Sequence, residues 1–155
     1  MSTRPVRGLV ARLAGDPLLW LAVGAGPLAW GAMVALGKMT YAPGNGFNDL
    51  TKLLIVVAAF PIAEEMLFRG VIQPAIADRI SVRALPGISA ANWLTSMAFG
   101  AAHLIAHPPA HAFATILPSL VFGFFRDRTA SVVPGIALHV WYNAGWFLLL
   151  APRTT

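Results

Sequence analysis

Five apolar segments dominate the chain, and charged or turn-forming residues separate them. They cover residues 17–37, 50–73, 87–106, 110–125 and 132–151. About 20 apolar residues are enough for a helix to cross a bilayer. Four of the segments reach roughly that length, and the shorter fourth one is expected to be tilted or partly buried. The pattern therefore predicts an all-α fold, a polytopic membrane helix bundle of about five transmembrane helices.

The segments that connect the apolar runs also have sequence patterns that predict their structure. Residues 38–49 are rich in proline and glycine and are expected to form an exposed loop. Residues 75–84 carry three charges and are expected to form a short interfacial helix. The run His107-Pro108-Pro109 should break the helix, because proline lacks the amide donor that a helix interior needs. The first segment is too long for the apolar region of a cleaved signal peptide, so we expect it to be retained.

Composition agrees with the membrane interpretation. Of the 155 residues, 57% are hydrophobic and only 11% are charged, whereas soluble domains carry about 25% charged residues. The absence of cysteine excludes disulfides, thiolate nucleophiles and cysteine-based metal sites. We predict a single integral-membrane domain over residues 1–155, in which residues 1–49 supply an amino-terminal span and loop. The lipid bilayer is an expected partner.

The net charge of +5 is better explained by topology than by nucleic acid, because the basic residues flank the apolar segments. With five spans, positive charge gathers on the cytoplasmic side, which predicts a cytoplasmic amino terminus. The residues expected on that side are Arg4, Arg7, Arg12, Arg79, Arg83, Arg126 and Arg128. Those expected on the other side are Lys38, Lys52 and Arg153.

Three polar clusters lie inside the apolar segments. They are Glu64, Glu65 and Arg69; Phe99 and His103; and His139 and Asn143. Ionisable groups at membrane depth cost a few kcal/mol or more, so they are usually paired and functional. Counted from the predicted cytoplasmic ends, all three clusters lie at a similar depth, roughly 22–24 Å at a rise of about 1.5 Å per residue. The sequence therefore predicts one shared site beyond the midplane.

The first cluster contains two carboxylates in different positions on one helix. Glu65 and Arg69 are four residues apart, so they share a face and are expected to form an ion pair. Glu64 projects about 100° away and faces a different neighbour. Adjacent carboxylates in different environments can hold different protonation states, as acid–base catalysis requires.

Absent motifs limit the chemistry. The chain has no HExxH motif, no GxSxG motif and no aspartate inside an apolar segment. What is present is a carboxylate base, imidazoles and an amide, which suit water activation and oxyanion stabilisation in amide hydrolysis. The same two glutamates and two histidines also suit a divalent metal such as zinc. Histidine and asparagine also bond between membrane helices without catalysis, so these alternatives stay open at this point.

The motifs EEMLFRG, FGAAH and HVWYN, in this order, resemble the EExxxR, FxxxH and HxxxN motifs of the CAAX protease and bacteriocin-processing family (CPBP, also called ABI). The resemblance covers about residues 60–146. It implies an intramembrane endopeptidase of the glutamic type, a class once described as metalloproteases. It also makes about residues 50–150 the catalytic core and assigns no cofactor.

The resemblance further implies roles for particular residues. Glu64 would be the base that activates water, with Glu65 and Arg69 supporting it. His103 would help to hold the water, with Phe99 packed beside it. His139 and Asn143 would form the oxyanion site.

The expected substrate is a membrane-anchored protein or peptide. Eukaryotic prenyl-protein members of the family have about eight spans, whereas this chain has about five predicted segments. It is closer in size to small members thought to act as bacterial sorting proteases, whose substrates carry a carboxyl-terminal motif, a membrane helix and a basic tail. The bacterial inner membrane is then the expected location. The alternatives are a metal-dependent membrane protease that uses His103, His139 and a glutamate as ligands, and a non-enzymatic immunity, scaffold or transport-accessory protein.

Overall fold

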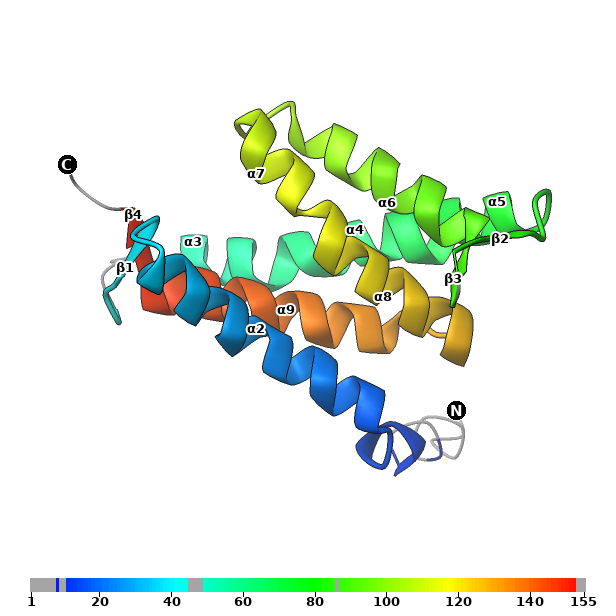
Figure 1. The fold of residues 1–155 in the computed structure, drawn as a ribbon, viewed down its shortest axis with the longest axis horizontal. Helices are drawn as coiled ribbons and strands as arrows, with labels where there is room; N and C mark the ends of the chain where they lie inside the picture. Colours follow the sequence, from blue (N-terminus) through cyan, green and yellow to red (C-terminus); the bar gives the residue numbers. More distant parts are fainter. Residues whose placement is uncertain (1–7, 9–10, 45–48, 86, 153–155) are drawn as a thin grey trace. The chain divides into compact units, whose positions relative to one another are not determined.

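The structure is a computed structural model that describes residues 8, 11–44, 49–85 and 87–152. The described chain is mostly helical (Figure 1), as predicted. The topology signals Arg4, Arg7 and Arg153, and residues 45–48 of the expected loop, lie outside the described residues. Two compact units are formed, one by Met1–Leu53 with Trp141–Thr155 and the other by Leu54–Val140. The single domain predicted from the sequence stays a prediction.

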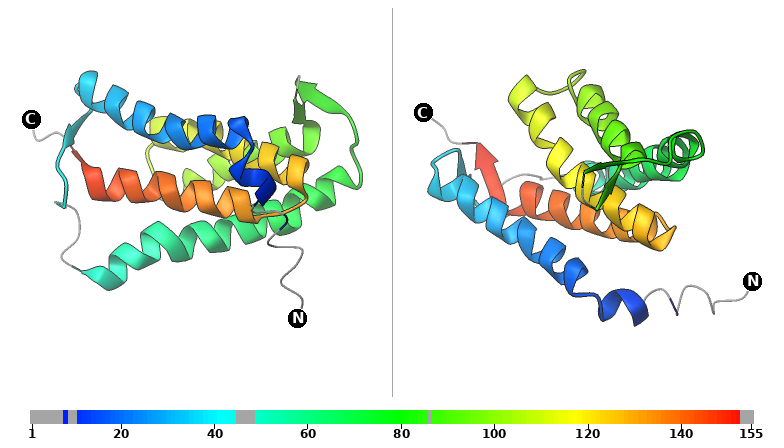
Figure 2. Two further views of the ribbon diagram at one scale, coloured as in Figure 1. Left: turned by 90° about the horizontal axis from the view of Figure 1, so that it is seen from below. Right: turned by 45° about the vertical axis from the view of Figure 1, so that its right-hand side comes forward.

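The first unit pairs α2 (Pro17–Ala35) with the carboxyl-terminal half of α9 (Val133–Leu149), as Figure 2 shows. Asp16 is the N-cap of helix α2, and its carboxylate accepts a hydrogen bond from the Leu18 amide at 3.0 Å. The Tyr142 hydroxyl donates to the Ala22 carbonyl at 2.6 Å, and the Trp141 indole donates to the Val23 carbonyl at 3.0 Å. These bonds fix the two helices against each other.

A short strand pair closes the same unit. Strand β1 (Met39–Tyr41) pairs antiparallel with β4 (Leu150–Pro152). The prediction of a continuous loop over residues 38–49 is therefore wrong at its start. Likewise, the last predicted helix ends at Leu149 rather than at residue 151. The sequence did not reveal this pairing because its two strands are short and more than 100 residues apart.

The second apolar segment forms one uninterrupted helical run. It consists of α3 (Leu50–Leu54), η1 (Ile55–Ala59), α4 (Phe60–Leu67), η2 (Phe68–Ile72) and α5 (Gln73–Ala77). The elements η1 and η2 are π-helical turns, and each lies just before a proline, Pro61 or Pro74. Because proline cannot donate to the preceding turn, wider turns at these points let the run continue. Such turns are frequent at functional sites.

The remaining helices belong to the second unit, apart from the end of α9. They are α6 (Ala90–His103), α7 (Pro109–Ala114) and α8 (Ile116–Thr129). The helix break predicted at His107-Pro108-Pro109 is confirmed. A second break at Thr115 was not predicted, and it follows from Pro118, which cannot donate to the Ala114 carbonyl four residues earlier.

The interfacial helix predicted over residues 75–84 is wrong in its second half. Helix α5 ends at Ala77, and β2 (Arg83–Leu85) then pairs with β3 (Ile88–Ser89). Ser89 follows directly as the N-cap of α6 and accepts a hydrogen bond from the Asn92 amide at 2.9 Å. Capping by a serine hydroxyl satisfies one of the free amides of the first helical turn. The last residue of the hairpin is therefore also the first capping residue of α6, with no loop between them.

Helices α6 and α8 pack closely (Figure 1). Gly123 permits this, because a Cβ atom there would overlap the Asn92 side chain. The Asn92 amide donates instead to the Leu120 carbonyl at 3.0 Å. Small residues let helix backbones approach closely in membranes. Gly123 therefore sets the spacing on which the site described below depends.

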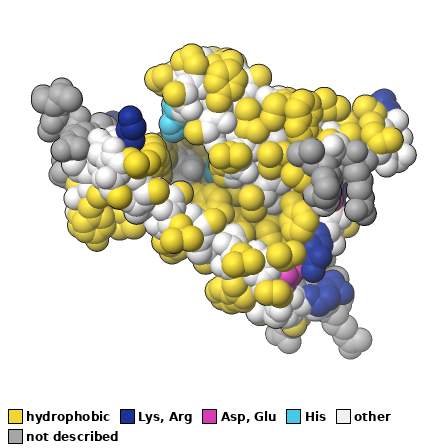
Figure 3. All heavy atoms as spheres, viewed as in Figure 1, with side chains coloured by type: hydrophobic (Ala, Val, Ile, Leu, Met, Phe, Trp, Pro, Cys, Tyr) yellow, Lys and Arg dark blue, Asp and Glu magenta, His cyan; other side chains and the backbone are white. Residues whose placement is uncertain are grey.

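Large hydrophobic side chains lie on the outside of the molecule. Ile105 is 91% exposed, and Leu28 and Leu117 are more than two-thirds exposed. Figure 3 shows hydrophobic side chains over much of the visible face. Exposed apolar surface of this extent is typical of a membrane or protein contact. Within the described part of the chain, only Pro17–Ala35 is long and apolar enough by itself to cross a membrane, so the five-span bundle stays a prediction.

Candidate active site

The pair predicted between Glu65 and Arg69 is present and fully buried. Arg69 Nη1 donates to Glu65 Oε1 at 3.0 Å, and neither side chain is exposed. Arg69 Nη2 continues to α8, where it donates to the Ser119 carbonyl at 2.8 Å and to the Ser119 hydroxyl. A buried ion pair is tolerated only when further hydrogen bonds satisfy the charges. Ser119 provides two such bonds for Arg69 and ties the motif helix to α8, while Arg69 Nε and Glu65 Oε2 have no hydrogen-bond partner among the described residues.

Three aromatic rings enclose the Arg69 guanidinium. Its central carbon lies 5.0 Å from the centre of the Phe99 ring and 5.5 Å from that of Phe122. Phe68 lies farther away, at 6.0 Å. Ring faces attract cations, and the delocalised guanidinium suits such a dry environment better than an ammonium group does. The arginine is therefore held by charge, hydrogen bonds and aromatic contacts together.

His139 lies between the two glutamates. Its Nδ1 is 3.2 Å from Glu65 Oε1, and its Nε2 is 3.6 Å from Glu64 Oε2. Because an ionised carboxylate only accepts hydrogen bonds, the shorter contact requires the proton on Nδ1. The ring stacks on Phe122 with centroids 5.0 Å apart. His139 therefore has a fixed orientation, with Nε2 directed toward Glu64.

The two glutamates differ sharply in accessibility. The Glu65 side chain is 0% exposed, whereas that of Glu64 is 34% exposed. Glu65 is engaged by Arg69 and His139, and the contact of Glu64 is the long one to His139. The arrangement has one neutralised, buried carboxylate beside one that solvent can reach.

The second motif packs against the first through Phe99. The Phe99 ring lies 4.5 Å from the His103 ring, as predicted, and 5.8 Å from that of His139. His103 Nδ1 is 2.9 Å from the Phe99 carbonyl. A carbonyl oxygen only accepts, so Nδ1 carries the proton, and Nε2 of the neutral imidazole is an acceptor. Two further histidines extend the series, with ring centroids 5.7 Å apart for His103 and His107 and 4.5 Å apart for His107 and His111.

Of the predicted site residues, Asn143 is the one that belongs to the first unit. It lies on α9, four residues after His139. Its grouping with the other six residues stays a prediction. Among the residues that the structure describes, no group of three or more histidine, aspartate or glutamate side chains is arranged to hold a metal ion.

Gly135 makes room for Glu65, and sequence analysis missed it. A Cβ atom at this position on α9 would lie 2.7 Å from Glu65 Oε2 and 3.5 Å from Phe122 Cβ. Ser119 was also missed as a partner of Arg69. Neither residue gives a local signal, because each acts on a residue at least 50 positions away along the chain. Only the packing of α8 and α9 on α4 reveals their roles.

Gly135→Ala is expected to destabilise the protein by about 1–3 kcal/mol, the usual cost of overpacking a core. Gly31→Ala is the matched control, because a Cβ atom at Gly31 on α2 meets nothing within 4 Å. The control should be neutral or slightly stabilising, since alanine is a better helix former than glycine. Thermal unfolding in detergent measures both variants. Equal stability of the two would contradict the close contact between Gly135 and Glu65.

Within the second unit, the first two motifs and His139 thus meet where buried charges and aromatic rings converge. Residues 46–145, 100 of the 155 residues, match the family described as type II CAAX prenyl endopeptidase Rce1-like. The chain therefore belongs to this family, whose members are membrane-embedded proteases. The family assignment inferred from the motifs is confirmed. No curated protein and no solved structure gives a significant match.

Proposed function

We propose that this protein is an intramembrane endopeptidase of the glutamic type. It hydrolyses a peptide bond in a membrane-anchored protein by means of water that Glu64 activates. The observation that carries the proposal is the unequal environment of the two adjacent glutamates. Glu65 is buried against Arg69 and His139, whereas Glu64 is one-third exposed. Paired carboxylates with separate environments take separate roles in acid–base catalysis.

In the proposed reaction, Glu64 takes a proton from water as the water oxygen attacks the scissile carbonyl carbon. His103 Nε2 accepts a hydrogen bond from the same water, because its Nδ1 is engaged by the Phe99 carbonyl. Protonated His139, donating from Nε2, and the Asn143 amide stabilise the oxyanion of the tetrahedral intermediate. The carbon–nitrogen bond then breaks, and Glu64 returns its proton to the departing amine. One water is consumed, and a new carboxyl and a new amino terminus are released.

Glu65 and Arg69 support this chemistry without touching the substrate. Glu65 fixes the His139 ring through Nδ1 at 3.2 Å, and Arg69 neutralises Glu65. A carboxylate behind a histidine sets the tautomer and the orientation of the ring. The buried pair therefore acts on the reaction through His139.

The family implies a membrane-anchored protein substrate. We assign the chain to the sorting-protease type of member rather than the prenyl-protein type, because a site near the outer face suits cleavage just outside a substrate's membrane helix. The basic residues of the sequence support a cytoplasmic amino terminus in a bacterial inner membrane. Cleavage near the outer face follows from the depth of the three motifs.

The test is cleavage in reconstituted lipid vesicles with heavy-oxygen water as solvent. One substrate set carries a carboxyl-terminal membrane helix with a basic tail, and the other carries prenylated carboxyl-terminal peptides. Mass spectrometry should find cleavage in the first set, with one heavy oxygen at each new carboxyl terminus. Cleavage confined to prenylated peptides would overturn the substrate assignment. If neither set is cut, the endopeptidase proposal fails.

Chelation separates this mechanism from metal-dependent hydrolysis. We expect cleavage to persist at the wild-type rate after exhaustive treatment with a chelator. Activity that is lost on chelation and returns with added zinc would replace the glutamic mechanism with one in which His103, His139 and a glutamate hold the metal. The metal content of the purified protein is the accompanying measurement.

A further inference from the structure

The carbonyl of Arg69 lacks the donors that a helix usually supplies. In an α-helix the amide of Gln73 would donate to it, but in η2 the Gln73 amide donates to the Phe68 carbonyl instead. The next possible donor, five residues ahead, is position 74, where proline has no N–H group. The backbone of the motif arginine is therefore left with an acceptor that its own helix does not satisfy.

Arg126, on α8, supplies the missing donor. Its Nε donates to the Arg69 carbonyl at 2.8 Å. Arg69 is wholly buried, so little water can reach its carbonyl to replace this bond. A buried carbonyl without a partner is costly, and the cost is higher still where the surroundings are apolar. The sequence places Arg126 only among the flanking basic residues, with a role in topology.

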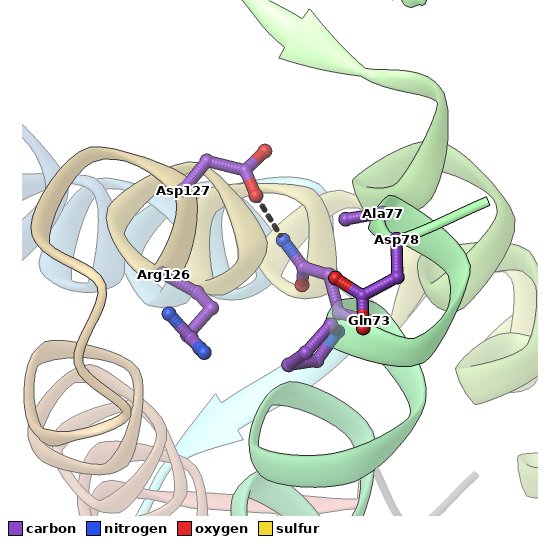
Figure 4. A pocket seen from close by; sticks show the side chains of 6 residues that line it. Gln73, Ala77, Asp78, Arg126 and Asp127 are labelled. Carbon is purple, nitrogen blue, oxygen red and sulfur yellow. Dashed lines mark hydrogen bonds between the residues drawn. The ribbon is translucent and has the colours of Figure 1, made fainter. Parts of the chain in front are cut away.

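Gln73 also joins the motif-bearing helical run to α8, farther along both segments. Gln73 Nε2 donates to the Gly123 carbonyl at 3.0 Å and to Asp127 Oδ1 at 2.7 Å (Figure 4). Arg126 and Asp127 line a pocket of about 200 Å³ with Gln73, Pro74 and two further residues of this run. The Gln73 tie does not touch the Arg69 carbonyl, which makes it a natural control.

We propose that Arg126 is a positioning residue for the reaction. By satisfying the Arg69 carbonyl, it holds the π-turn η2 in register and keeps the Arg69 side chain on Glu65. Glu65 in turn orients His139. The inference rests on the proposed function, because its catalytic consequence is measured by peptide-bond cleavage. The structural part of the inference is that Arg126 binds the Arg69 carbonyl, which Pro74 leaves without a donor. This hydrogen bond is measured separately, without substrate.

Two substitutions that match each other in length separate the hydrogen bond from the charge. Arg126→Gln places an amide nitrogen where Nε lies, whereas Arg126→Met places a methyl group there, and both remove the charge. We expect Arg126→Met to lower kcat about tenfold, equivalent to about 1.4 kcal/mol, with KM little changed. Arg126→Gln should stay near the wild-type kcat. Equal loss in both variants would overturn the proposal, because the charge would then be what matters.

A second-site change provides the stronger test. Pro74→Ala restores an N–H group five residues beyond Arg69, where it can donate to the freed carbonyl. The double variant Arg126→Met/Pro74→Ala should therefore recover most of the lost kcat. Asp127→Ala, which removes the bond from Gln73 to Asp127 and leaves the one to the Gly123 carbonyl, should lower the unfolding temperature and gain nothing from Pro74→Ala. If Pro74→Ala fails to rescue Arg126→Met, or rescues Asp127→Ala equally, the positioning role is wrong.

The carbonyl itself can be observed without any substrate. Solid-state NMR in lipid, with a carbonyl-carbon label on arginine and an amide-nitrogen label on glycine, selects Arg–Gly pairs. Arg69-Gly70 becomes the single such pair once Arg7→Lys removes the other. Arg126→Met should shift this resonance and Arg126→Gln should leave it in place. If the wild-type protein shows this pattern but cleaves no substrate, the proposed protease function is wrong and the hydrogen bond from Arg126 to the Arg69 carbonyl stands. If the protein is active but Arg126→Met leaves the resonance unshifted, that hydrogen bond alone is wrong.

Discussion

Glu64→Gln is expected to abolish cleavage while the protein inserts and folds normally. The amide matches the carboxylate in shape but cannot take a proton from water, and losing a general base costs about 10²–10⁴-fold in rate. Structural damage should be small, because Glu64 is partly exposed and its contact with His139 Nε2, at 3.6 Å, is too long for a good hydrogen bond. Mass spectrometry of products and an unfolding curve in detergent measure the two expectations.

Asp78→Asn is the matched control for Glu64→Gln. It removes a carboxylate from the end of the same helical run, at an exposed position outside the site. Its cleavage rate should equal that of the wild-type protein. Full activity of Glu64→Gln would exclude Glu64 as the base. The alternative, that the protein is a non-enzymatic membrane protein, predicts a different result. The Glu64→Gln variant would then keep its biological role wherever it accumulates.

Contacts one helical turn apart were predictable from the sequence. Glu65 meets Arg69, and Phe99 meets His103, because residues four positions apart share a helix face. The break at Pro108-Pro109 was equally accessible, since it follows from the missing amide of proline. In each case the information is local. The convergence of the two histidine-bearing helices on the glutamates was inferred from depth, and His139 does reach both of them.

Contacts between helices were not predictable in this way. Ser119 and Arg126 reach Arg69 across 50 and 57 positions in the chain, and neither stands in a recognisable motif. The π-turn η2 has a local cause in Pro74, but the donor that binds the Arg69 carbonyl lies far away in the sequence. Gly135 belongs with these residues, because a Cβ atom at this position would displace the side chain of the distant Glu65. A single sequence lacks the distances that decide such contacts.

Arg69→Met is expected to be the most destabilising change in the site. It leaves Glu65 charged and wholly buried, without the donor now at 3.0 Å. Breaking one member of a buried ion pair costs about 3–5 kcal/mol, because the remaining charge is uncompensated. It also leaves the Ser119 hydroxyl and carbonyl without their shared donor. Equilibrium unfolding in mixed micelles measures the loss, and a loss below about 1 kcal/mol, typical of exposed pairs, would contradict the burial.

Replacing both members of the pair should give a different result. In Glu65→Met/Arg69→Met no charge remains buried, and well-packed apolar replacements of buried pairs are often neutral or stabilising. The double variant should therefore be more stable than Arg69→Met alone. The stabilities of the wild-type protein, Glu65→Met, Arg69→Met and the double variant together give the coupling energy of the pair. Its cleavage rate should still be about 100-fold or more below that of the wild-type protein, because His139 Nδ1 has lost its acceptor.

This separation of stability from rate bears on why the chain keeps the pair. An ion pair retained for folding would be replaceable by apolar side chains without effect on the reaction. A double variant that is as stable as the wild-type protein and fully active would thus remove Glu65 and Arg69 from the mechanism. Stable but inactive protein is the outcome we expect. It would mean that Arg69 holds the Glu65 carboxylate in place so that Glu65 can direct His139 toward Glu64.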